Sequence, residues 1–185
     1  MKVADHSQQQ LNSDSPKSRR NFFMDNQELP KQRAIAALKS LFIGDALAMP
    51  VHWYYSVMDI ERQFPGGVTD FEDAPAHHPS SIMSLHSTSQ GGRGNSRRKA
   101  SAASEIVGDV ILKGKRKYWG VSNQHYHQQM VAGENTLNAH CAMALMKTLN
   151  RHGGQYSPDR FLGAYINLMT ADPAQHPDTY AESYH

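Results

Sequence analysis

The chain has little cysteine and little net charge. Cys141 is its only cysteine among 185 residues, which excludes an internal disulfide framework and favours a reducing compartment such as the cytoplasm. The net charge of +2 gives no reason to expect a nucleic-acid partner, because nucleic-acid binding needs a larger basic footprint. No continuous apolar run approaches the length of a membrane span, and the first residues lack the apolar core of a secretory signal. We therefore expect a cytoplasmic protein without a membrane partner.

Residues 1–29 also have few apolar side chains. Their Gln- and Ser-rich composition offers too little surface to bury, so we predict a disordered tail. Residues 30–185 are long enough for one domain with its own core. Within them, residues 68–98 show no periodicity and are predicted to form a long loop.

Apolar residues recur at helical spacing in several segments. The pattern predicts helices over about 30–47, after Ser56, over 137–149 and after Ser157-Pro158, each with a start signal or an apolar face. Residues 178–185 look like the opening of a further helix. Convincing alternating strands are absent, and the predicted fold class is all-α.

Oxygen-bearing side chains gather where the helix over 137–149 is expected to begin. Glu134, Asn135, Thr136 and Asn138 are typical of a helix entrance, where side-chain oxygens cap free backbone N–H groups. Hard cations also prefer such oxygen ligands. The residues alone leave both interpretations open, capping and a metal site.

Asp45 is the anomaly of the first predicted helix. It closes an apolar face with a carboxylate, directly after Gly44, a residue that permits close backbone approach. A carboxylate there needs a partner, which can be a helix N-terminus, a cation or a ligand. The nearby aromatic stretch that contains His52 could line a pocket or belong to the core.

Three other patterns are less specific. His125 and His127 would share one side of an extended segment, but no third ligand follows at zinc-site spacing. The glycine-rich residues 89–95 could cradle a phosphate, although a flexible loop explains them equally. The basic residues 97–99 and 113–117 leave an RNA-binding module as a separate alternative.

Two segments together resemble motifs of the ADP-ribosylglycohydrolase family. Gly44-Asp45-Ala46-Leu47, followed by Pro50, is similar to the family's Gly-Asp-Ala-Leu-Gly and Pro. Gly133-Glu134-Asn135-Thr136 is similar to the family's Thr-Asp-Asp-Thr, in the right order and at roughly the right spacing. The resemblance implies an orthogonal multi-helix all-α fold, of which residues 30–185 would form the incomplete N-terminal part.

The resemblance also implies a function and a site. It implies a hydrolase with a two-metal Mg²⁺ or Mn²⁺ centre, which removes ADP-ribose from a modified protein or small molecule. The implied residues are the metal ligands Glu134, Asn135 and Thr136, the catalytic residues Glu134, Asp45 and His52, and the substrate-binding residues Gly44 and Asn138.

The chain departs from the family pattern at two positions. Glu134-Asn135 replaces Asp-Asp, which removes one negative charge, and His52 stands where the family usually has Glu. The family's C-terminal Asp-rich motif has no counterpart before His185. We therefore expect weak metal binding and no turnover by this chain alone. The alternative is a non-catalytic ADP-ribose-binding or structural derivative of the same fold.

Overall fold

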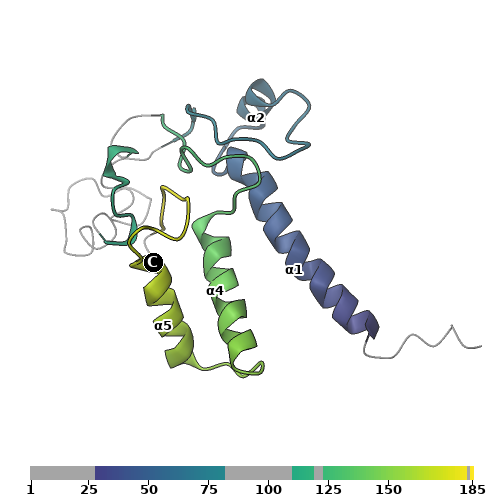
Figure 1. Ribbon diagram of the computed structural model, residues 1–185. Coiled ribbons are helices and arrows are strands. Elements are labelled where there is room, and N and C mark those ends of the chain that lie inside the picture. Colours follow the sequence, from purple (N-terminus) through teal and green to yellow (C-terminus); the bar gives the residue numbers. More distant parts are fainter. Residues whose placement is uncertain (1–27, 82–109, 119–122, 183) are drawn as a thin grey trace, which may run out of the picture. The chain divides into compact units, whose positions relative to one another are not determined.

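The computed structural model describes residues 28–81, 110–118, 123–182 and 184–185 (Figure 1). Its elements are the α-helices α1 (Glu28–Ala48), α2 (Val57–Gln63), α4 (Leu137–Arg151) and α5 (Pro158–Met169), and the 3₁₀ turns Met49–Val51 and Arg116–Tyr118. The described residues contain no strand, only an isolated bridge between His77 and Gln124. The predicted all-α class is confirmed.

Several sequence predictions lie outside the described residues. These are the disordered tail up to residue 27, the glycine-rich residues 89–95 and the basic residues 97–99. The chain divides into two units, residues 1–38 and 39–185. Every contact described below lies within the second unit.

Helix α1 is longer and more apolar than its sequence pattern suggested. By length and composition Glu28–Val51 could cross a membrane, contrary to the expectation that no apolar run has that length. Core helices of soluble proteins pass the same test, so it does not assign a location. The helix ends at Ala48, just before Pro50, which is buried together with Met49 in the following 3₁₀ turn.

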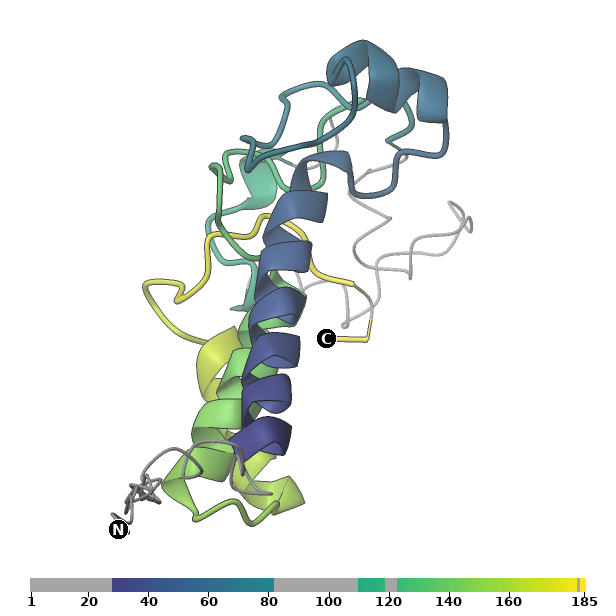
Figure 2. The ribbon, with the colours of Figure 1, turned by 90° about the vertical axis from the view of Figure 1, so that its right-hand side faces the viewer.

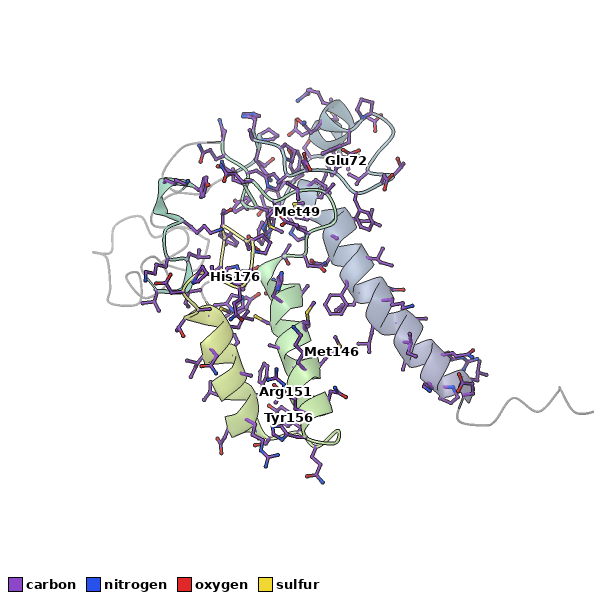
Figure 3. The ribbon with its side chains drawn as sticks, viewed as in Figure 1. Met49, Glu72, Met146, Arg151, Tyr156 and His176 are labelled. Atoms are coloured by element: carbon purple, nitrogen blue, oxygen red, sulfur yellow. The ribbon has the colours of Figure 1, made fainter. Side chains whose placement is uncertain are left out.

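Helices α4 and α5 lie side by side and form the main helix pair of the second unit (Figures 1 and 2). Figure 3 labels Arg151 at the end of α4 and Tyr156 in the turn that leads to α5. Ser157 caps α5, because its hydroxyl accepts a hydrogen bond from the N–H of Arg160. Both predicted helices are confirmed.

The C-terminal segment is not helical where a helix was predicted. Residues 178–182 and 184–185 are irregular and lie beside the start of α4 (Figure 1). The prediction failed because the side chain of Asp178, at the start of this segment, accepts the N–H of Leu137 in α4 as well as that of Tyr180. The segment instead contributes Tyr180 and Ala181 to the hydrophobic core, where they pack with Leu137.

Candidate functional site

Asp45 closes the entrance of α4. One carboxylate oxygen accepts hydrogen bonds from the Thr136 N–H at 2.8 Å and the Asn135 amide at 2.9 Å. The other accepts from the Thr136 hydroxyl at 2.6 Å. The Asn135 amide also donates to the carbonyl of Phe42 at 2.8 Å, so this junction ties α1 to α4. The geometry is that of a cap for a neighbouring helix, one of the three roles that the sequence left open for Asp45.

A second carboxylate serves the same helix start. Asp178 Oδ2 accepts the Leu137 N–H at 2.8 Å, and both residues are only 1% exposed. Burial alone would raise the pKa of Asp178, but its contacts with His127 and with the N–H groups of Leu137 and Tyr180 bring this pKa below its usual value. The carboxylate is therefore ionised at neutral pH.

Two imidazoles extend from Asp178 in a hydrogen-bonded row. His127 Nδ1 lies 2.8 Å from Asp178 Oδ1, and His127 Nε2 lies 2.8 Å from His52 Nδ1. Burial, followed by the neighbouring His127, lowers the pKa of His52 to about 4. At neutral pH, His52 is thus an uncharged imidazole at the end of a row that begins with a buried carboxylate.

Two further histidines hold the backbone that carries His52. His125 Nε2 donates to the carbonyl of Pro50 at 3.0 Å, and His78 Nε2 donates to the carbonyl of His52 at 2.8 Å. Their Nδ1 atoms accept backbone N–H groups, that of His127 at 3.1 Å and that of Ser80 at 3.2 Å. Both rings are fully buried and use both nitrogens structurally.

The two histidines considered as a zinc pair are used separately. The ring centroids of His125 and His127 lie 5.8 Å apart, and each ring is engaged in its own hydrogen bonds. The described part of the chain contains no group of three or more His, Cys, Asp or Glu residues suited to a metal ion. A zinc site finds no support in this geometry.

A small cavity lies beside the start of α4, and we call it the α4 cavity. Its volume is about 160 Å³. Its lining residues are His52, Trp53, His127, Thr136, Asn138, Asp178 and Glu182. Asn138 is fixed there, because its amide donates to Glu182 at 3.0 Å and its carbonyl oxygen accepts from the Tyr184 hydroxyl at 3.1 Å.

Trp53 gives the α4 cavity an aromatic wall with an unusual backbone. Its φ angle is 58°, a left-handed conformation that non-glycine residues seldom adopt and that is enriched at functional sites. Its ring stacks on His127, with centroids 5.6 Å apart and planes 22° apart, and packs against Tyr126 and Tyr180. This packing fixes the wall of the cavity.

The structure brings some predicted site residues together and leaves others apart. His52, Thr136 and Asn138 line the α4 cavity, and Asp45 bonds directly to Thr136. Glu134 instead folds back on its own turn, where Oε2 accepts the Val131 N–H at 2.9 Å. No described atom lies within 4 Å of a Cβ built on Gly44, so the described residues show no close approach there.

The oxygen donors near α4 fit a two-metal centre poorly. Both Asp45 oxygens already accept hydrogen bonds, and Glu134 Oε2 is used by its own loop. Asn135 and Thr136 add only neutral donors, whereas divalent cations in such centres are held by several carboxylates. Metal binding therefore remains a prediction.

Four lining residues were not among the predicted site residues: Trp53, His127, Asp178 and Glu182. His127 did carry a signal, the alternation of His125 and His127, but it was considered for zinc alone. Asp178 was predicted to lie at the start of a helix of its own, but it accepts the N–H at the start of α4. Trp53 belongs to the aromatic stretch around His52, for which a pocket and the core were both left open, whereas Glu182 stands in no pattern that distinguishes it from a surface residue.

The family model for ADP-ribosylglycohydrolase matches residues 26–183, which include both the Asp45 segment and the Glu134–Thr136 segment. The chain therefore belongs to the ADP-ribosylglycohydrolase family, and the predicted membership is confirmed. Membership supports a hydrolase that acts on ADP-ribose linkages. No curated protein and no solved structure matches the chain.

Proposed function

We propose that this chain binds the ribose of an ADP-ribosylated protein or small molecule in the α4 cavity, as part of a metal-dependent hydrolase that releases ADP-ribose. One observation carries the proposal. The two segments that resemble family motifs meet through the bonds of Asp45 to Asn135 and Thr136, and Thr136 lines a polar cavity. A cavity with convergent polar groups is the natural place for a ligand.

The size and lining of the α4 cavity favour a sugar ring. Its volume of about 160 Å³ is smaller than the roughly 300–1,000 Å³ of pockets that enclose a whole drug-sized ligand. One ribose therefore fits better than a complete ADP-ribose. Asn138 and Glu182, which are hydrogen-bonded to each other at 3.0 Å, line it with an amide and a carboxylate, and Trp53 adds an apolar face.

The metal is proposed to bind weakly. Mg²⁺ or Mn²⁺, when bound, would orient sugar hydroxyls and activate water. Glu134 and Asn135 are the side chains best suited to hold it, but only Glu134 is charged, and the Asp45 carboxylate is engaged with α4. We therefore expect no turnover by the 185-residue chain alone.

Calorimetric titration with ADP-ribose tests the binding site. We expect Asn138→Leu to weaken binding about tenfold or more, because it replaces a polar side chain that lines the cavity with an apolar one. Asn150→Leu, an exposed position of the same helix, is the matched control and should leave affinity unchanged. Equal effects of both variants, or no binding of ADP-ribose at millimolar concentration, would rule out the α4 cavity as the site.

The role of metal needs a separate measurement. Millimolar Mn²⁺ should strengthen the binding of ADP-ribose to the wild-type chain, and Glu134→Gln should remove this gain. Hydrolysis of ADP-ribosyl-arginine, ADP-ribosyl-serine and O-acetyl-ADP-ribose is followed in parallel. Metal-dependent turnover that Glu134→Gln abolishes would show that the existing ligands suffice, and the proposal of weak metal binding would fail.

A second candidate function is a non-catalytic ADP-ribose-binding derivative of the fold. The observation that favours it is the engagement of Asp45 and Glu134 in local hydrogen bonds. This candidate predicts binding of ADP-ribose that is indifferent to Mn²⁺, which separates it from the hydrolase.

A further inference from the structure

The hydrogen bonds around Asp178 determine which nitrogen of His127 carries a hydrogen. Asp178 Oδ2 accepts the Leu137 N–H, and Oδ1 accepts the Tyr180 N–H at 3.1 Å. An ionised carboxylate can only accept hydrogen bonds. The remaining contact of Oδ1, with His127 Nδ1 at 2.8 Å, therefore requires a hydrogen on that nitrogen.

The tautomer of His127 in turn determines that of His52. If His127 carries hydrogen on Nδ1 alone, its Nε2 is bare and must accept its hydrogen bond. Its partner is His52 Nδ1 at 2.8 Å, so that nitrogen donates. A neutral His52 then has a bare Nε2. This atom faces away from His127, because the two nitrogens of an imidazole point in diverging directions.

Four histidines lie close together here: His52, His78, His125 and His127. Among the described residues, only His52 of these four has a ring nitrogen without a hydrogen-bond partner. His78 and His125 use Nε2 on backbone carbonyls and Nδ1 on backbone N–H groups. His127 uses both nitrogens in the row. His52 Nε2 has no hydrogen-bond partner among the described residues, and His52 lines the α4 cavity.

We propose that Asp178 keeps the single hydrogen of an uncharged His127 on Nδ1 and thereby holds His52 in the tautomer that leaves Nε2 bare, so that Nε2 is the proton acceptor of the α4 cavity. His52 would be the catalytic base, and His127 and Asp178 are positioning residues. The titratable groups that act on His52 are the carboxylates of Asp45, Asp178 and Glu182, which favour a positive charge arriving in the row, and the imidazoles of His127 and His125, which oppose it.

The inference rests on the proposed function for its reaction. A water oxygen forms a bond to the anomeric carbon of the bound ribose, and the bond from that carbon to the leaving group breaks. The leaving group keeps the electron pair and takes a proton from solvent. The water proton goes to His52 Nε2, while the hydrogen on Nδ1 passes to His127 Nε2, which places the positive charge beside Asp178.

The tautomers can be measured without any substrate. In ¹⁵N-labelled chain at pH 8, the nitrogen shifts of each imidazole distinguish a bare nitrogen from one that carries hydrogen. We expect His52 to show a bare Nε2 and a hydrogen on Nδ1, with His52→Gln identifying its signals. A hydrogen on His52 Nε2 in the wild-type chain would overturn the proposal, even if no variant folds.

A variant of Asp178 tests whether the effect is relayed. In Asp178→Leu, His127 Nδ1 has no acceptor, so the hydrogen of an uncharged His127 is expected on Nε2, where His52 Nδ1 can accept it, and the hydrogen of His52 then lies on Nε2. The His52 Nε2 signal should then move from the bare range to the N–H range. Asp172→Leu, at a carboxylate with 65% side-chain exposure, is the matched control and should change nothing. A folded Asp178→Leu with unchanged His52 tautomer would refute the relay.

Binding measurements keep the two proposals apart. If His52 shows the expected tautomer but ADP-ribose does not bind, the proposed function fails and the relay remains. If ADP-ribose binds but His52 Nε2 carries hydrogen, the relay fails and the proposed function remains.

Discussion

The carboxylate of Asp178 accepts the backbone N–H of Leu137, forty-one positions earlier in the chain, at 2.8 Å. Asp45 does the same for Thr136 from the other side of the sequence. The start of α4 is therefore held by two carboxylates that its own local sequence does not supply. These long-range caps determine what substitutions near the site should do.

Asp45→Asn should destabilise the fold by about 1–3 kcal/mol. The N–H of the new amide would point at N–H and O–H groups that now donate hydrogen bonds to the carboxylate. Urea unfolding measures this loss. Asp172→Asn, on the surface, should change the free energy of unfolding by less than about 0.5 kcal/mol. If Asp45→Asn instead leaves stability unchanged but weakens binding of ADP-ribose or Mn²⁺, Asp45 serves the ligand rather than the helix.

Thr136→Val should remove the donor at 2.6 Å from Asp45 while preserving side-chain shape. Because Thr136 is buried and Asp45 would lose one of its three hydrogen bonds, we expect a loss of about 1–3 kcal/mol in thermal or urea unfolding. Thr136→Ser keeps the hydroxyl and should cost clearly less. A larger loss in Thr136→Ser than in Thr136→Val would show that the methyl group, not the hydroxyl, matters.

The stability of the chain should fall as the pH drops below about 6.5. Burial, with His127 as the next cause, lowers the pKa of His52 to about 4 and that of His125 to about 3. Between these values and the ordinary histidine pKa, the unfolded chain binds protons that the folded chain does not. Each group therefore removes up to ~1.4 kcal/mol per pH unit. Urea midpoints at pH 7.5, 6 and 5 measure the decline, and a flat profile would contradict these depressed pKa values.

Gly44→Ala tests a residue whose substrate role rests on sequence alone. Gly44 lies inside α1 with nothing within 4 Å of an added Cβ, so alanine should stabilise the helix by about 0.5–1 kcal/mol. Thermal unfolding measures this gain. A simultaneous loss of ADP-ribose affinity would show that a ligand approaches Gly44 closely, as its motif predicts.

Local signals in the sequence predicted the helices well. Ser56 and Ser157 accept hydrogen bonds from N–H groups three positions later, a relation contained entirely within each short segment. The apolar spacing after Leu137 likewise predicted α4, because a helix face needs no distant partner to be visible in a sequence.

The site was predicted only where its residues also carry a local pattern. Asp45 and Thr136 stood out as an odd carboxylate and a helix entrance, and they are bonded to each other. The roles of His127 and Asp178 depend on a contact across fifty-one positions, for which nothing in either segment selects the partner. Asp178 was consequently assigned to a helix that does not form.

The two carboxylates at the start of α4 also bear on hydrogen exchange. The first N–H groups of a helix have no acceptor within the helix and usually exchange quickly with solvent. Here the N–H groups of Thr136 and Leu137 are held by Asp45 and Asp178, in residues that are 1% exposed. Their exchange requires Asp45 and Asp178, which lie on either side of α4 in the sequence, to move away from the start of the helix. The exchange rates of these two amides should therefore report the opening of the whole second unit rather than the fraying of one helix end.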